Sequence, residues 1–135
     1  ETASLKIHFY AVDENGLPGE KILKKDFIVS IKKGGRNNKI NVSDFNLTMP
    51  KNGIFVGFEK LMIENNKEEK TITDPNTKDT KVLRTYYPLL LYNYMDRDFN
   101  YTFSGGKWIK ETAETKGLST KINAYQPAIN LILTN

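Results

Sequence analysis

Two-residue alternation runs through Leu5-Lys6-Ile7-His8-Phe9-Tyr10-Ala11-Val12. Apolar residues stand at the odd positions and more polar ones between them, which is the period of a strand with one buried face. The segment ends in Asp13-Glu14-Asn15-Gly16-Leu17-Pro18-Gly19, where the Asn-Gly and Pro-Gly dipeptides favour tight turns. The stretch therefore predicts a strand that gives one face to a core and then turns back.

Similar short apolar segments recur along the whole chain. Further strands are predicted at residues 27–31, 39–42, 54–63, 82–83, 86–94, 101–103, 107–109 and 128–134. The first two predict a hairpin across Gly34-Gly35. The nearly continuous apolar run 54–63 is typical of a strand covered on both faces, or of a central strand. Pro88 marks an edge strand or an irregular crossing. Since no segment keeps a helical period, we predict an all-β, jelly-roll-like antiparallel β-sandwich of about eight or nine strands.

The 135 residues predict a single domain, 1–135, because this length suffices for one core. With 39% hydrophobic and 27% charged residues, the composition is that of a soluble globular protein. Residues 64–81 are almost all polar and lack periodicity, so we expect a flexible excursion there. No apolar run reaches the roughly 18 to 20 residues that span a bilayer, so no transmembrane segment is predicted.

Metal and thiol chemistry have few candidate residues. The chain has no cysteine and one histidine, His8, which excludes disulfides, a Cys nucleophile and the common zinc sites. Calcium stays open at Asp13-Glu14-Asn15 and at Asp96 and Asp98, but turn chemistry explains the first cluster equally well. We therefore predict no metal and no other cofactor.

Catalysis is not predicted either. His8 lies on the presumed outer face of its strand without the nucleophile and carboxylate that a triad requires. Glu59 is the one acid inside a strongly apolar strand, whereas glycoside hydrolysis needs two positioned carboxylates. Alternation places Glu59 at a strand edge or beside a lysine, and a remote glycan-active enzyme domain remains an alternative.

Exposed aromatic rings are the groups with which sandwich modules grip sugars, because the apolar face of a pyranose stacks on a flat ring. The candidates are Trp108, Tyr86, Tyr87, Tyr92, Tyr94 and Tyr101. The alternative is that the tryptophan and several tyrosines fill the core or its margins.

The second candidate site is basic. The chain carries 20 Lys and Arg against 16 Asp and Glu, a net charge of +4. Lys32, Lys33, Arg36 and Lys39, with Lys24 and Lys25 nearby in sequence, surround one predicted hairpin. Such a patch can bind polyanions by counterion release, yet no aromatic residues are interleaved as in a nucleic-acid groove. An exported location, which the resemblance described below implies, would favour acidic glycans or lipid headgroups over nucleic acid. A solvated face that protects a strand edge is the alternative.

Several motifs carry a resemblance. The strand ending in Tyr10 and its Asn15-Gly16-Leu17-Pro18-Gly19 turn begin the match, which continues at 40–47, 53–59, 104–108 and 131–135. In this order the motifs resemble the C-terminal β-sandwich region of carboxypeptidase-regulatory-like-domain proteins of Bacteroidetes envelopes. The resemblance implies an exported protein with a small β domain ahead of this one, and no peptidase activity. The start at Glu1 is interpreted as a processed chain.

Together these observations predict a non-catalytic accessory or interaction module of an exported bacterial cell-envelope protein, periplasmic or surface-exposed. Its partner would be an envelope protein or a glycan. One alternative is a carbohydrate-binding module that uses the exposed aromatics. Another is a structural brace between domains, which predicts an exposed apolar patch near the chain ends.

Overall fold

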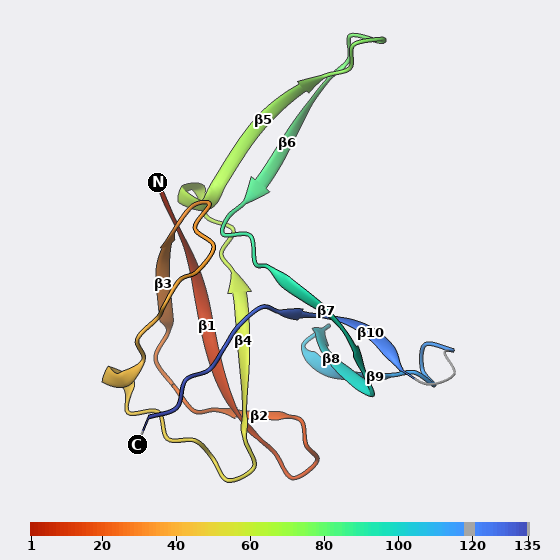
Figure 1. Ribbon diagram of the computed structural model, residues 1–135. Coiled ribbons are helices and arrows are strands. Elements are labelled where there is room, and N and C mark those ends of the chain that lie inside the picture. Colours follow the sequence, from red (N-terminus) through yellow and green to blue (C-terminus); the bar gives the residue numbers. More distant parts are fainter. Residues whose placement is uncertain (118–120, 135) are drawn as a thin grey trace. The chain divides into compact units, whose positions relative to one another are not determined.

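The computed structural model describes residues 1–117 and 121–134, and its backbone divides into two compact units, Glu1–Leu89 and Leu90–Asn135 (Figure 1). Both units consist of antiparallel strands, so the predicted all-β, sandwich-like class is confirmed. The described residues form ten strands in one four-stranded and three two-stranded sheets, where eight or nine strands were expected. The single-domain prediction stays a prediction, because the division follows backbone contacts and not independent folding.

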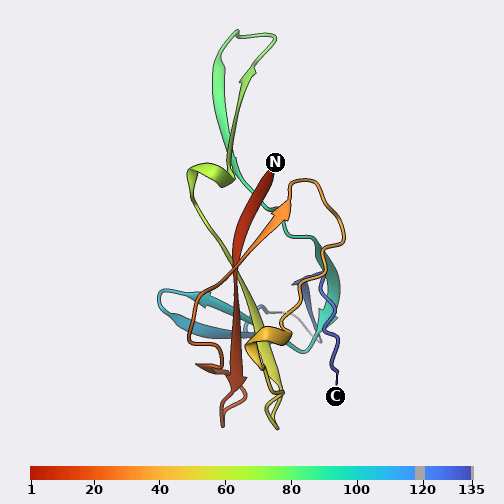
Figure 2. The same ribbon diagram turned by 90° about the vertical axis from the view of Figure 1, so that its left-hand side faces the viewer.

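The first unit contains six strands and two short 3₁₀ turns. They are β1 (Thr2–Val12), β2 (Pro18–Lys21), β3 (Phe27–Lys32), η1 (Ser43–Phe45), β4 (Ile54–Lys60), η2 (Glu64–Asn66), β5 (Lys67–Thr73) and β6 (Thr80–Tyr86). β1 is the centre of the four-stranded sheet and pairs with β2, β3 and β4 (Figure 1 and Figure 2). The β4 pairing, from Leu5 to Ala11, overlaps both others, so β4 takes one edge of β1 while β3 and β2 share the other.

One face of β1 forms the core of this sheet, as the alternation predicts. Ala3, Leu5, Ile7 and Phe9 are all at most 6% exposed, while the residues between them are only partly covered. The ring of Phe27 on β3 stacks near Phe9 and lies 4.6 Å from the ring of Phe45, so the loop that carries η1 packs against this face. Burial of these apolar side chains is the main stabilising term of the sheet.

One strand prediction in the first unit is wrong, and of the two alternatives for residues 54–63 the central strand is not found. Residues 39–42 do not form a strand, and β3 pairs instead with β1, from Thr2 opposite Lys32 to Ile7 opposite Phe27. The eleven-residue β1 offers β3 a longer ladder than the loop after it, which contains two glycines and two asparagines. In the described residues β4 pairs only with β1, so it is an edge strand and not the central one.

The polar excursion at 64–81 contains secondary structure that the sequence did not predict, while its flexibility stays a prediction. η2 and β5 occupy its first half, and β5 pairs with β6 over seven residue pairs, from Lys67 opposite Tyr86 to Thr73 opposite Thr80. The turn is closed by Asp74, whose backbone N–H donates to the Asp79 carbonyl at 2.8 Å. Threonine and isoleucine in β5 favour extended backbone, and the sequence pattern misses this because nearly every side chain of the ribbon is exposed.

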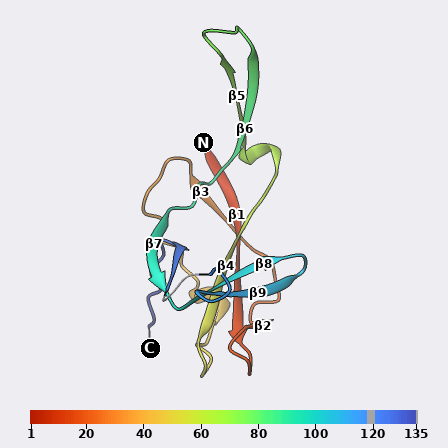
Figure 3. The same cartoon turned by 90° about the vertical axis from the view of Figure 1, so that its right-hand side faces the viewer.

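The second unit contains two ribbons. β7 (Tyr92–Arg97) pairs with β10 (Ile122–Pro127), and β8 (Phe99–Ser104) pairs with β9 (Lys107–Thr112) (Figure 3). The predicted hairpin at 101–103 and 107–109 is confirmed, and its turn uses Gly105 and Gly106, both at positive φ. Pro88 lies between β6 and β7, at the irregular crossing that its ring predicts.

The closing strand predicted at 128–134 is wrong. The strand lies six residues earlier, at Ile122–Pro127, where Ile122 and Ala124 are buried at 4% and 3% exposure. Residues 128–134 have no regular secondary structure. Among the described residues no helix has the length and apolar character that crossing a bilayer requires.

Candidate functional site

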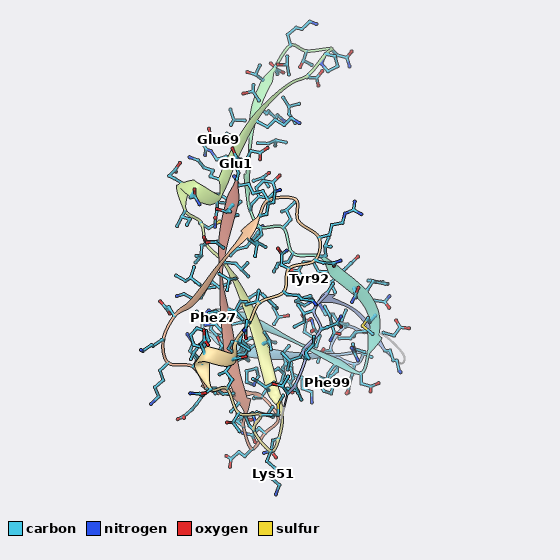
Figure 4. The ribbon with its side chains drawn as sticks, turned by 60° about the vertical axis from the view of Figure 1, so that its left-hand side comes forward. Glu1, Phe27, Lys51, Glu69, Tyr92 and Phe99 are labelled. Atoms are coloured by element: carbon cyan, nitrogen blue, oxygen red, sulfur yellow. The ribbon has the colours of Figure 1, made fainter. Side chains whose placement is uncertain are left out.

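The β7–β10 ribbon carries exposed tyrosines on one of its two faces. Tyr94 lies directly opposite Tyr125, and Tyr92 opposite Pro127, so all three rings share a face. Their exposed fractions are 53% for Tyr92, 58% for Tyr94 and 68% for Tyr125. Tyr92 lies at the start of β7 (Figure 4). We call the set Tyr92, Tyr94, Asp96, Asn123, Tyr125 and Pro127 the tyrosine face.

The opposite face of the same ribbon explains why the tyrosines point outward. It carries the buried Ile122 and Ala124, together with Arg97 and Gln126. The Arg97 guanidinium donates to Gln126 Oε1 at 2.6 Å, which fixes its side chain on this side. Because successive residues of a strand alternate, burial of this face places Tyr94 and Tyr125 on the other one.

Two of the rings form a tilted pair. The centroids of Tyr94 and Tyr125 are 5.0 Å apart and their planes meet at 54°. This separation lies in the range in which aromatic pairs attract one another. The pair therefore holds its own geometry while leaving more than half of each side chain open to a ligand.

Acceptor groups complete the tyrosine face. Asp96 and Asn123 are directly opposite one another, next to the Tyr94–Tyr125 pair in the ladder. Both are exposed, and within residues 1–117 and 121–134 neither makes a side-chain hydrogen bond or ion pair. The face thus combines apolar ring surface with free carboxylate and amide oxygens.

The β8–β9 hairpin carries the second aromatic cluster. Phe103 and Trp108 meet edge to face at a 5.1 Å centroid distance, and Phe99 meets Tyr101 in the same way at 5.5 Å. The ammonium of Lys110 lies 4.6 Å from the centre of the Phe99 ring. Trp108 and Tyr101 are half-buried. Neighbouring side chains thus cover part of the Trp108 and Tyr101 rings, so these ring contacts stabilise the β8–β9 hairpin.

The other predicted aromatic residues lie in the first unit. Tyr86 ends β6 opposite Lys67, and the Tyr87 backbone N–H donates to the Asn66 carbonyl at 2.8 Å. Both tyrosines are half-buried. Of the six predicted aromatic residues, Tyr101 and Trp108 thus share a face of the β8–β9 hairpin but are half-buried, whereas Tyr92 and Tyr94 share a face of the β7–β10 ribbon and are both more than half exposed.

Tyr125 is the member of the tyrosine face that the sequence analysis missed. The stretch before residue 124 reads as polar, so no strand is predicted there. A two-residue period was nevertheless present, and it could have indicated a strand there. One set of alternate residues is Ile122, Ala124 and Gln126, and the other is Asn123, Tyr125 and Pro127.

The basic residues are distributed along the end of β3 and the loop after it. Lys32, Arg36 and Lys39 are exposed, whereas the Lys33 side chain is only 18% exposed. Lys33 bonds Glu1 at 3.2 Å and lies 5.6 Å from the centre of the Tyr87 ring. Lys33 is therefore engaged within its own unit, and anion binding by this set stays a prediction.

The residues considered for catalysis meet on the outer face of the four-stranded sheet. His8 Nε2 lies 2.6 Å from Glu59 Oε2, so the partner of Glu59 is a histidine and not the expected lysine. The nearest lysine on β1, Lys6, pairs with Asp26 at 3.1 Å. Burial, and then the negative charge of Glu59, raise the pKa of the neighbouring Tyr10 hydroxyl above its ordinary value of 10.0.

The acidic turn considered for calcium is explained by hydrogen bonds. Asp13 Oδ1 accepts the backbone N–H groups of Asn15 and Leu17, each at 2.8 Å. This is the local capping typical of aspartate in turns. In the part of the chain that the structure describes, no group of three or more His, Asp or Glu side chains is placed to hold a metal ion.

Comparison with known proteins gives no relationship to draw on, because no protein-family model, curated protein or solved structure matches this chain.

Proposed function

We propose that this chain is a non-catalytic binding module that takes a carbohydrate on its tyrosine face. The observation that supports it is the placement of Tyr92, Tyr94 and Tyr125, each more than half exposed, on one face of the β7–β10 ribbon. Tyrosine gives a large, rigid contact area at a low cost in conformational entropy, which suits it to recognition. Its ring can stack on the apolar side of a sugar while its hydroxyl reaches a neighbouring group.

The surroundings of the Glu59 carboxylate support a non-catalytic role. Its carboxylate is bound to His8 at 2.6 Å on the outer sheet face and is 51% exposed. A general acid in a glycosidase needs a raised pKa in an apolar setting and a second carboxylate across the substrate. A carboxylate in water beside an imidazole does not provide that setting.

Export to the bacterial cell envelope is part of the proposal. It rests on the resemblance of the turn after β1 and of the later motifs to envelope proteins. Fractionation of the source cells with an antibody to this chain tests it. Recovery from the periplasm or the cell surface agrees with the proposal, whereas recovery from the cytoplasm alone contradicts it.

The direct test is a glycan array followed by calorimetry on the best ligand. We expect Tyr94→Ala and Tyr125→Ala each to weaken binding about 3-fold to 10-fold, because each removes one stacking ring worth about 0.5–1.5 kcal/mol. Phe103→Ala is the matched control, since Phe103 is an equally exposed ring on the other ribbon. Absence of binding to any glycan, or an equal loss in the control, contradicts the proposal.

A second candidate function, the structural brace, is favoured by the apolar residues near the C-terminus. Ile129, Leu131, Ile132 and Leu133 are 46%, 48%, 78% and 66% exposed. A run of exposed apolar side chains marks a surface that another protein covers. Hydrogen exchange of residues 128–134, measured in this chain and in the full-length protein, tests this role. Strong added protection in the longer protein agrees with a brace, and equal exchange contradicts it.

A further inference from the structure

The polar end of the tyrosine face, formed by Asp96 and Asn123, carries a negative charge. Asp96 supplies a carboxylate, and the residue opposite it, Asn123, supplies a neutral amide. The remaining members of the face are tyrosines and a proline, so these six residues include no cationic side chain. The next residues of the same period, Asp98 and Lys121, lie just outside the ladder and carry opposite charges. The nearest cation on β7, Arg97, belongs to the opposite face and is bound to Gln126.

The negative charge of Asp96 favours neutral glycans over acidic ones. A sugar hydroxyl can donate to the Asp96 carboxylate, and such charge-assisted bonds are about twice as strong as neutral ones. The charged group of a uronic acid, a sulfate ester or a phosphate ester meets a like charge at Asp96 instead. Asn123 adds an acceptor and two donors, which match the mixed donor and acceptor character of a hydroxyl.

The spacing also suits a ligand that touches both parts of the face. Side chains of directly opposed residues have Cβ atoms about 4.5–5.5 Å apart, and the next pair on the same face lies about 6.8 Å along the strands. The ladder order therefore places the Asp96 and Asn123 pair one step from the Tyr94 and Tyr125 pair. A ring that stacks on the tyrosines can direct its hydroxyls toward the acceptors.

We infer that the ligand of the tyrosine face is a neutral glycan, whose rings stack on Tyr94 and Tyr125 and whose hydroxyls donate to Asp96 and bond with Asn123. This inference rests on the proposed function and adds the class of sugar. It also separates the tyrosine face from the basic residues of the first unit, for which acidic glycans or lipid headgroups were expected.

The test compares neutral oligosaccharides with uronic-acid oligosaccharides of equal length by calorimetry. The wild-type chain is expected to bind the neutral series at least about 10-fold more tightly, as expected for one charge-assisted hydrogen bond gained against one charge repulsion. Binding of the neutral series is expected to change less than about 2-fold when salt is raised from about 0.05 M to about 0.5 M, because no ion pair forms.

The decisive variant is Asp96→Asn, which keeps the shape of the side chain and removes its charge. It is expected to weaken neutral binding about 10-fold and to reduce the discrimination against uronic acids. Asp44→Asn is the matched control, because Asp44 is exposed and belongs to η1 of the first unit and not to the β7–β10 ribbon. It is expected to stay within about 2-fold of the wild type.

Each outcome decides something different. Equal or tighter binding of the uronic-acid series overturns the inference while the proposed carbohydrate binding stands. Unchanged neutral binding by Asp96→Asn overturns the role of Asp96 in the same way. Absence of binding to either series overturns both the inference and the proposed function, and capture of a protein ligand on the tyrosine face does the same.

Discussion

The side-chain amide of Asn66 pairs with the backbone of Ser4 as a neighbouring strand would. Its Oδ1 accepts the Ser4 N–H at 2.8 Å, and its Nδ2 donates to the Ser4 carbonyl at 2.7 Å and to the Leu61 carbonyl at 2.8 Å. The β1–β4 ladder ends one residue away, at Leu5 opposite Lys60. Asn66 is fully buried, and its own carbonyl accepts the Tyr87 N–H, so it joins β1 to the base of the β5–β6 ribbon, where β5 begins and β6 ends.

Asn66→Ala is expected to lower the free energy of unfolding by about 2–4 kcal/mol. The substitution leaves the Ser4 N–H and two carbonyls without partners in a buried place, and each such group costs about 1–3 kcal/mol, partly relieved by relaxation and water. Urea unfolding followed by circular dichroism measures the change. Asn65→Ala is the matched control, because Asn65 is exposed, and it should change stability by less than about 0.5 kcal/mol. Equal losses in the two variants contradict this role for Asn66.

The β5–β6 hairpin is expected to loosen in acid. Arg84 Nε donates to the Glu69 carboxylate at 2.8 Å, and this hydrogen bond, followed by the charge of Lys67, lowers the pKa of Glu69 below its ordinary value of 4.5. Backbone N–H groups of Asn76 and Thr77 similarly lower the pKa of Asp74 below 3.8. A lowered carboxyl pKa stabilises the folded form above the unfolded value, and this contribution is lost as pH falls through the folded value.

Amide hydrogen exchange and chemical shifts of residues 67–86, followed from pH 7 to about pH 2, measure this opening. Glu69→Gln should already weaken the hairpin at pH 7 and make its acid response smaller. Glu68→Gln is the control, because Glu68 lies on the other face of the ribbon (Figure 4 labels Glu69). A hairpin whose exchange is the same at pH 7 and pH 2 argues against the electrostatic contribution of Glu69 and Asp74.

Tyr10 is expected to titrate above 10.0, its ordinary pKa. Partial burial is the larger cause and the charge of Glu59 the smaller one. Because the folded pKa is raised, the contribution to stability is complete below the unfolded value and is lost as pH rises through the folded one. Nuclear magnetic resonance of the Tyr10 ring carbon that bears the hydroxyl follows this directly. Glu59→Gln should lower the pKa only in part, and Glu68→Gln should leave it unchanged. A Tyr10 midpoint at or below 10.0 would contradict the assignment.

The prediction of the fold from sequence succeeds where burial leaves a pattern. Residues 5–12 alternate because one face of β1 is buried, and the glycines at 105 and 106 mark a turn that needs positive φ. Residues 67–73 show no alternation because both faces of their ribbon are in water. Their strand is held by pairing with β6 and by ion pairs across the ribbon, and such pairing leaves little trace in a single sequence.

Only part of the candidate site follows from the sequence, because a single strand shows its own period but not its pairing. Tyr92 and Tyr94 stand two residues apart, so a shared face follows from the strand period alone. That Tyr125 joins them depends on the β7–β10 register, which pairs Tyr125 with Tyr94, 31 positions earlier in the sequence. The strand period does not show whether Trp108 or the tyrosines are more available to a ligand. The reason is that it does not reveal the edge-to-face contact between Phe103 and the tryptophan ring.

Gly57 limits the size of the side chain that β4 can carry opposite His8. A Cβ atom added there would lie 3.3 Å from Tyr10 Cε2 and 3.7 Å from His8 Cβ. Gly57→Ala gains about 0.5–1 kcal/mol from lost chain entropy in the unfolded state, and a small shift of the Tyr10 ring offsets this gain. We expect a stability close to that of the wild type. Gly57→Val adds two methyl groups beside the ring, so overpacking of about 1–3 kcal/mol should exceed the entropic gain.

A double-mutant cycle identifies the tyrosine ring as the cause of that loss. If the valine at this position is harmful because it displaces the Tyr10 ring, Tyr10→Ala should remove most of the cost, and the two substitutions should show a coupling of about 1 kcal/mol or more. Urea unfolding of the wild type, both single variants and the double variant gives this coupling energy. Additive effects, or a Gly57→Val chain as stable as Gly57→Ala, would show that β4 accommodates the larger side chain without displacing the Tyr10 ring. The close approach of Tyr10 to β4 would then not be what favours glycine at this position.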